Sequence, residues 1–117
     1  MADGVLVIQS EPDRERGGGF ERFYDEVHIP EILETPGFLR GRRYRAIPQS
    51  AGDSRSDWHS QLAIYDMRAD DLSVAYAALR DRMERGTLTT RDVFSSARPY
   101  RSQLFELEFD ARTMLTP

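Results

Sequence analysis

Three amino acids are absent from this chain of 117 residues: cysteine, lysine and asparagine. Without cysteine there is no thiol nucleophile, no disulfide, no cysteine-ligated zinc site and no iron–sulfur cluster. All sixteen basic residues are arginine, so the chain has no lysine with which to form a Schiff base or to act as a base. The lack of asparagine removes every N-glycosylation acceptor.

Long apolar runs are missing as well. The run Val5–Ile8 is far too short for a signal peptide, and no stretch approaches the ~18 apolar residues that span a bilayer. We therefore expect a cytoplasmic protein that does not enter a membrane. The formal net charge of -4 argues against a general nucleic-acid binder, which usually has a basic domain.

Length and composition predict a single domain over residues 1–117. Domains cluster at ~100–150 residues, and a chain of this size can bury a core without disulfides or metals. Hydrophobic residues make up 39% of the chain and charged residues 31%, which is typical of an ordinary globular protein.

Apolar periodicity predicts six main elements in the order β-α-β-β-α-β. Alternating or β-branched stretches favour strands, and stretches with a 3.6-residue period favour helices. The first expected elements are a strand over 5–8 and a helix from Phe20 that kinks or restarts at Pro30 and ends at Pro36-Gly37. Strands over 38–47 and 58–67 follow, and then a helix that is N-capped by Asp70 and has Gly86 past its end. The last expected element is a strand over 100–109 with Phe105, Leu107 and Phe109 on its apolar face. Residues 90–96 are compatible with one more short helical turn.

The second predicted strand is dense in arginine. Strict alternation would put Phe38, Arg40, Arg42 and Tyr44 on one face and Arg43 on the other. The arginines therefore do not form an anion site on one side of the strand. We expect most of them to pair with acidic residues across the sheet, with Glu106, Glu108 or a nearby aspartate.

This element order is that of the ferredoxin-like split unit, an α+β fold in which two helices cover one face of an antiparallel four-stranded sheet. Such a sheet leaves its other face uncovered. A second copy of the same sheet is the simplest cover. The architecture therefore predicts a homodimer.

The segment from Phe20 to Tyr44 carries a recognisable pattern. It contains Phe23-Tyr24-Asp25-Glu26-Val27-His28-Ile29-Pro30, followed by Thr35-Pro36-Gly37-Phe38 and by Arg42-Arg43-Tyr44. This pattern resembles the EthD-like branch of the dimeric α+β barrel superfamily. The resemblance implies two ferredoxin-like subunits with facing sheets, and an apolar cavity in each subunit with the His28 helix as one wall.

The superfamily that the chain resembles has many activities. It includes cofactor-free monooxygenases, polyketide cyclases, lactone isomerases, decarboxylases and heme enzymes, so the resemblance does not choose among them. Neither of the two histidines, His28 and His59, has a heme-ligand signature around it, and their spacing does not support a metal pair. We expect neither a metal nor a cofactor.

His28 is the strongest candidate for a catalytic residue. An imidazole titrates near pH ~6.5 and suits proton transfer at neutral pH. Tyr24 and Asp25 lie four and three residues before it on the same predicted helix side, so Tyr24 could donate a hydrogen bond to a substrate and Asp25 could orient the ring. The alternative is a helix-end histidine whose ring bonds to a backbone carbonyl, with Tyr24 as a core side chain.

Candidates for substrate binding come from the two central predicted strands. Tyr65, His59 and Gln61 share one face of a strand and either line a cavity or lie at a dimer seam or solvated edge. An arginine of the basic strand could clamp a carboxylate or an enolate. The full set of substrate-binding candidates is Tyr65, His59, Gln61, Arg42, Tyr44 and Trp58.

We therefore expect an enzyme that acts on a small hydrophobic molecule, aromatic or polyketide-like, at a carbonyl group. Cyclisation, isomerisation, dehydration and decarboxylation need only proton transfer, which His28 can supply. One alternative is a cofactor-independent monooxygenase for the same class of substrate. Another is a non-catalytic protein that binds such a molecule within a biosynthetic or degradative pathway.

Overall fold

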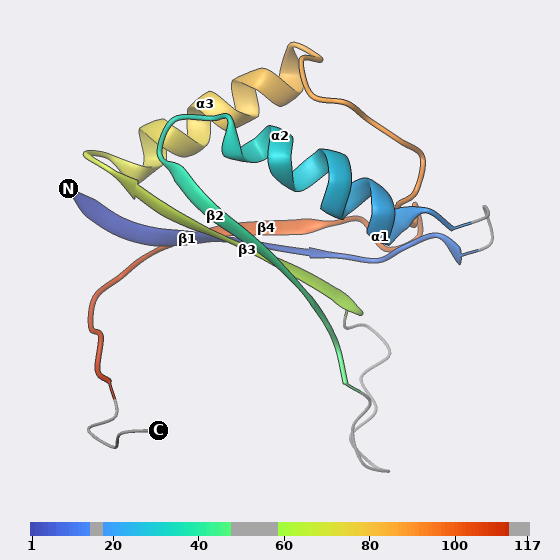
Figure 1. The fold of residues 1–117 in the computed structure, drawn as a ribbon, viewed down its shortest axis with the longest axis horizontal. Coiled ribbons are helices and arrows are strands. Elements are labelled where there is room, and N and C mark those ends of the chain that lie inside the picture. The colour runs from blue at the N-terminus through green and yellow to red at the C-terminus, as the bar shows by residue number, and fades with distance from the viewer. Residues whose placement is uncertain (15–17, 48–58, 113–117) are drawn as a thin grey trace.

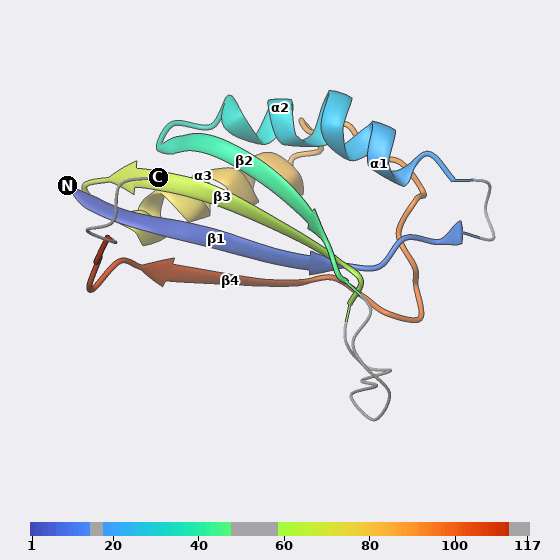
Figure 2. The ribbon, with the colours of Figure 1, turned by 60° about the horizontal axis from the view of Figure 1, so that its bottom comes forward.

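The computed structural model describes residues 1–14, 18–47 and 59–112 (Figure 1). Four strands form one antiparallel sheet in the order β2-β3-β1-β4, which Figure 2 shows from its uncovered side. The elements are β1 (Ala2–Ser10), α1 (Phe20–Phe23), the π-helix η2 (Tyr24–His28), α2 (Ile29–Leu33), β2 (Phe38–Arg45), β3 (Gln61–Ala69), α3 (Leu72–Glu84) and β4 (Arg101–Glu106). The predicted α+β class and the β-α-β-β-α-β order are confirmed.

The helices lie together on one face of the sheet (Figure 1). The core fills the space between the two layers, where Leu6 of β1 and Tyr65 of β3 are completely buried beneath Phe20 and Tyr24. Side chains alternate along each strand, so the residues next to these buried ones point to the uncovered face of the sheet. That side carries Phe105, which is 45% exposed. None of the described helices is long and apolar enough to cross a membrane.

The last strand is shorter than predicted, and the residues predicted for its apolar face, Phe105, Leu107 and Phe109, are exposed. β4 ends at Glu106, three residues before the predicted end. Leu104 pairs with Leu6 and packs against the core, so Phe105 faces the uncovered side of the sheet. Phe109 lies beyond the strand and is 83% exposed.

A bulge in β2 changes the predicted faces of that strand. Phe38 pairs with Met67, but Arg40 pairs with Asp66, the very next residue of β3 on its N-terminal side. Leu39 is therefore an extra residue of β2 without a partner in β3, which is a β-bulge. Because of this bulge, Phe38 faces the core and Arg40 remains exposed. The prediction that Phe38 and Arg40 share a face was wrong.

The sheet order also corrects the expected partners of the arginines. β2 and β4 form opposite edges of the sheet, so neither Glu106 nor Glu108 lies across from β2. Arg42 instead pairs with Asp66 on the neighbouring strand, at 2.8 Å. Arg43 pairs with Asp25 on the helix above, also at 2.8 Å.

The N-cap of α3 is one residue later than predicted. The carboxylate of Asp71 accepts hydrogen bonds from the backbone N–H groups of Ser73 at 2.9 Å and Val74 at 3.3 Å. Asp70 precedes this cap. Asp71 therefore satisfies two of the free N–H groups that every helix has at its start.

Residues 90–96 do not form the short helical turn that the sequence allowed. Phe94 and Pro12 form an isolated antiparallel bridge. The Asp13 N–H donates to the Val93 carbonyl and the Ser95 N–H donates to the Glu11 carbonyl, both at 2.8 Å. The backbone of this segment is thus hydrogen-bonded to the residues that follow β1 and cannot close a helical turn.

The helix break at Pro30 takes a specific form. The Ile29 N–H donates to the carbonyl of Tyr24, five residues earlier, which is the wide turn of a π-helix. Pro30 has no N–H, and its ring would collide with the carbonyl four residues before it in a regular α-helix. The wide turn over Tyr24–His28 relieves this conflict immediately before α2 begins.

Candidate functional site

A cavity of about 580 Å³ lies between the helices and the sheet. Leu6 and Ile8 of β1 contribute to its lining from the sheet. The first helical segments contribute Phe23, Tyr24 and His28. The rest of the lining comes from Ile32 of α2, from α3, from the segment that connects α3 to β4, and from the start of β4. The volume falls within the range of pockets that enclose small organic ligands.

Aromatic rings hold the His28 imidazole in this wall. The ring of Phe23 stacks on it with a centroid distance of 5.5 Å. Tyr24 meets it edge-on at 4.8 Å, and Phe94 does so at 6.4 Å. The imidazole is therefore oriented mainly by packing.

The ionisation of His28 follows from this apolar setting. Burial lowers the pKa of His28 below its ordinary value of 6.5, and the nearby Glu31 carboxylate opposes this shift with a smaller effect. Its Nδ1 is buried and has no hydrogen-bond partner among the described residues. The side chain is accordingly neutral at pH 7 and keeps a lone pair with which to accept a proton.

The π-helix explains why Tyr24 and His28 belong to the same wall. The turn between them contains one residue more than an α-helical turn, and both residues line the cavity. Such wide turns occur frequently at functional sites. The sequence predicts a break at Pro30 but does not predict this geometry.

The Tyr24 hydroxyl lies next to side chains of the sheet. The hydroxyl groups of Ser10 and Tyr65 are its neighbours, and burial raises the pKa of Tyr24 to about 12 against their smaller opposing effect. Tyr65 is completely buried, and burial raises its pKa as well. Its hydroxyl makes no well-formed hydrogen bond within the described part of the chain. Tyr24 therefore presents its ring to the cavity, and Tyr65 lies behind it.

Asp25 lies outside the cavity. Its two carboxylate oxygens accept from Nε and Nη2 of Arg43 at 2.8 and 2.9 Å, and this contact holds the pKa of Asp25 below its ordinary value. Arg43 also donates from Nη1 to the side chain of Gln61 at 3.1 Å. The structure thus places Asp25 and Gln61 around the same arginine, and it shows no hydrogen bond between Asp25 and His28.

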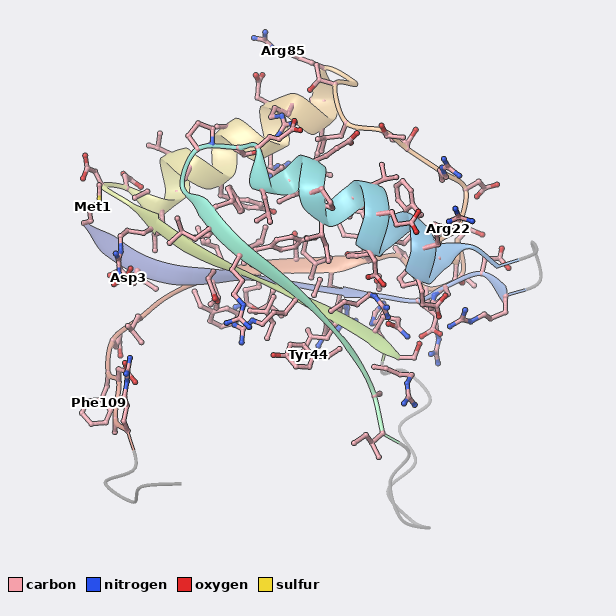
Figure 3. All side chains as sticks on the ribbon, in the orientation of Figure 1. Met1, Asp3, Arg22, Tyr44, Arg85 and Phe109 are labelled. Carbon is pink, nitrogen blue, oxygen red and sulfur yellow. The ribbon has the colours of Figure 1, made fainter. Side chains whose placement is uncertain are left out.

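The other substrate-binding candidates are dispersed. Arg42 donates to Tyr44 Oη at 3.2 Å and to Asp66 at 2.8 Å. Tyr44 lies on the uncovered side of the sheet, as Figure 3 shows. The His59 ring makes a 2.8 Å hydrogen bond with the Pro99 carbonyl. Trp58 lies outside the described residues.

No protein-family model and no curated protein matches the chain. Solved structures do match it. A candidate monooxygenase from Shewanella loihica PV-4 aligns with 97% of this chain and 99% of its own at a TM-score of 0.57 and 11% identity. An EthD-like protein from Ralstonia eutropha JMP134 aligns with 89% of this chain and 91% of its own, with a TM-score of 0.53 and 14% identity. An EthD family protein from Bacillus halodurans C-125 aligns with 89% of this chain and 96% of its own, with a TM-score of 0.50 and 17% identity. The chain has the EthD-like, ferredoxin-like fold.

The EthD-like fold brings residues to the cavity that sequence analysis did not single out. Phe94 contacts the His28 ring although it lies in the segment after α3, and Arg91 lines the cavity from the same segment. Tyr76 and Met83 lie on the apolar stripe of α3, which predicts burial but not a cavity. The helical period of apolar residues marks this stripe in the sequence, but no sequence pattern marks Phe94 or Arg91. Among the described residues no group of three or more histidine, aspartate or glutamate side chains is arranged to hold a metal.

Proposed function

We propose that the protein is an enzyme that moves a proton on a small apolar molecule, with His28 as the general base or acid. The observation that carries this proposal is the neutral, aromatic-packed imidazole in the wall of the 580 Å³ cavity. Of the described side chains that line the cavity, His28 is the one whose ordinary pKa lies near neutrality. A base with a pKa near the working pH is the most effective in such a step.

The proposed substrate is an aromatic or polyketide-like carbonyl compound. The rings of Phe23, Tyr24 and Phe94 surround the imidazole and offer flat apolar surfaces. When a base removes a proton beside a carbonyl group, the electron pair moves onto the carbonyl oxygen and an enolate forms. Cyclisation, isomerisation, dehydration and decarboxylation beside a carbonyl group can all proceed through such an enolate. In this scheme Tyr24 acts through its ring. The assistance of Asp25 remains a prediction, as do the substrate contacts of Tyr65, His59, Gln61, Arg42, Tyr44 and Trp58.

Hydrogen–deuterium exchange at carbon tests this proposal without knowledge of the natural substrate. 2-Tetralone is an apolar aromatic ketone with acidic protons beside its carbonyl, and their replacement in D2O is followed by proton NMR. We expect the wild-type protein to accelerate this exchange. The variant His28→Gln should lower the protein-dependent rate by about 100-fold or more. The control is Arg85→Gln, because Arg85 lies outside the cavity lining and pairs with Asp81 at the surface.

Three results of this experiment have different meanings. Loss of exchange in His28→Gln but not in Arg85→Gln supports the proposal. Equal rates in all three proteins overturn the role of His28. Binding of 2-tetralone with no acceleration in the wild type would favour the non-catalytic alternative, in which the cavity only holds the ligand.

A cofactor-independent monooxygenase is the second candidate, supported by the fold shared with the candidate monooxygenase from Shewanella loihica. In such a reaction the base forms an electron-rich carbanion, which then reacts with molecular oxygen. Anthrone is a suitable probe because it loses a proton to give a stabilised anion. Oxygen uptake that depends on anthrone and on His28 would assign the protein to this class, and exchange of 2-tetralone without oxygen uptake would assign it to the first.

We also propose that the protein is a homodimer in which the uncovered sheet faces meet. Leu39, Phe105 and Leu107 expose about half or more of their surface on or beside that face. A second copy is the simplest way to remove this apolar area from water. Sedimentation should give twice the 13.5 kDa chain mass, and Phe105→Glu should give a monomer. A wild-type monomer at micromolar concentration would contradict the proposal.

The cytoplasmic location remains a prediction from the sequence.

A further inference from the structure

The exposed part of the cavity lining carries two arginines, Arg80 on α3 and Arg91 on the segment that follows it. Neither guanidinium has an ion pair or a hydrogen bond with any residue that the structure describes. The other arginines at this end of α3 are engaged. Arg82 donates to the Glu31 carbonyl at 2.8 Å, and Arg85 forms an ion pair with Asp81 at 3.0 Å.

Arg91 is placed over the apolar wall of the cavity. Its Cζ lies 5.9 Å from the centroid of the Phe23 ring, the same ring that stacks on His28. A cation over an aromatic face is attracted by the ring electrons, which restricts where the guanidinium lies. Arg91 thus lies against the wall of the cavity, and its N–H groups make no hydrogen bond to any residue that the structure describes.

The charge at this opening is opposite to the charge of the whole chain. Among the described residues that line the cavity, Glu84 is the one carboxylate, against the two guanidinium groups of Arg80 and Arg91. The chain as a whole has a net charge of -4. Positive groups next to a low-dielectric cavity attract an anion more strongly than the same groups would on an open surface.

From this arrangement we infer that the ligand of the cavity carries a carboxylate, which Arg80 and Arg91 bind at the opening while the apolar body lies beside His28. The inference rests on the proposed function and specifies its substrate class as an aromatic or polyketide-like carboxylate. The planar guanidinium matches a carboxylate in geometry. An anion held at the opening would also orient the apolar body, so that one end always faces the imidazole.

A matched pair of probes separates the charge from the apolar body. 2-Naphthoate has a carboxylate, and methyl 2-naphthoate has the same rings without the charge. Isothermal titration measures the Kd of each probe for the wild type, Arg80→Gln, Arg91→Gln and the double variant. The control is Arg85→Gln, which removes an arginine of the same helix end that does not line the cavity.

We expect the wild type to bind 2-naphthoate more tightly than the ester. Each single variant should weaken 2-naphthoate binding about fivefold and the double variant more, while ester binding stays within twofold. Added salt should weaken naphthoate binding to the wild type and have little effect on the double variant. Arg85→Gln should behave as the wild type. Circular dichroism melting of each variant shows that the fold is intact.

Two results would overturn the inference, and they differ in what they say of the proposed function. Equal affinity of the wild type for both probes, unchanged in the double variant, overturns the carboxylate site but leaves the cavity as a ligand site. Binding of neither probe overturns both. The variant Ile8→Phe adds bulk to the cavity lining and should weaken both probes equally. If it weakens neither, the probes bind elsewhere and the inference fails.

Discussion

The Asp25 carboxylate, on the helix that carries His28, lies against the Arg43 guanidinium of β2 with both oxygens engaged, at 2.8 and 2.9 Å. This contact joins η2 to the edge strand of the sheet. It also directs Asp25 away from the histidine that follows it by three residues. Aromatic packing and the helix backbone therefore position His28, and the ion pair between Asp25 and Arg43 attaches its helix to β2.

A double-mutant cycle measures the contribution of this ion pair. Asp25→Asn, Arg43→Gln and the double variant should show a coupling of about 0.5–1 kcal/mol in the free energy of unfolding, because Asp25 is half exposed. Urea denaturation at pH 7 provides the measurement. The exposed pair Arg22–Glu26 is the control and should show a smaller coupling. Strictly additive effects of Asp25→Asn and Arg43→Gln would contradict the structure.

The burial of His28 makes stability depend on pH in a defined direction. Its pKa is lower in the folded than in the unfolded chain, so the unfolded chain binds the proton first as the pH falls. Stability is full above the ordinary value of 6.5 and decreases as the pH falls through the folded pKa. Between pH 7.5 and 5 the wild type should lose stability, and His28→Gln should show a flatter profile. Urea melts at several pH values test this; parallel profiles would show that His28 is not buried in solution.

Gly41 lies where β2 passes beneath the start of α2. A Cβ at this position would lie 2.6 Å from Ile29 Cγ2 and 3.1 Å from Cε1 of Tyr65. Gly41→Ala should therefore push the helix from the sheet and destabilise the protein by about 1–3 kcal/mol. The neighbouring exposed position offers a control, since Arg40→Ala should change stability by less than about 0.5 kcal/mol. Thermal unfolding with equal effects of the two variants would contradict this packing.

Substitution of the adjacent residues Asp70 and Asp71 shows which of them caps the start of α3. Asp71→Ala removes the side chain that accepts from the N–H groups of Ser73 and Val74, and should cost about 1 kcal/mol. Asp70→Ala leaves this cap intact and should cost much less. Chemical denaturation of the two variants distinguishes the cap in the structure from the one predicted by the sequence. A larger loss in Asp70→Ala would show that the prediction was correct.

Much of the fold was predictable because its signals are local. The alternation of apolar residues along Gln61–Ala69 and the helical spacing from Phe20 follow from the geometry of single elements. The break at Pro30 follows from a missing N–H group. These signals were sufficient for the element order, for the resemblance to the EthD-like branch and for the choice of His28 as the best candidate.

The remaining features depend on which elements meet, and no local pattern encodes that. The bulge between Phe38 and Arg40 exists only against β3, and it decides which face each residue of β2 presents. Asp25 could have reached His28 on a regular helix, but in the assembled sheet its carboxylate is bound by Arg43.

The site shows the same division. The sequence by itself determined that a histidine with an aromatic neighbour would lie on the first helix. Only the tertiary structure decided its chemistry, because the pKa of His28 depends on burial by residues distant along the chain, among them Phe94. The position of Arg91 over Phe23 depends in the same way on the path of the segment between α3 and β4. Desolvation and charge placement are properties of an assembled fold, and the sequence specifies them only through that fold.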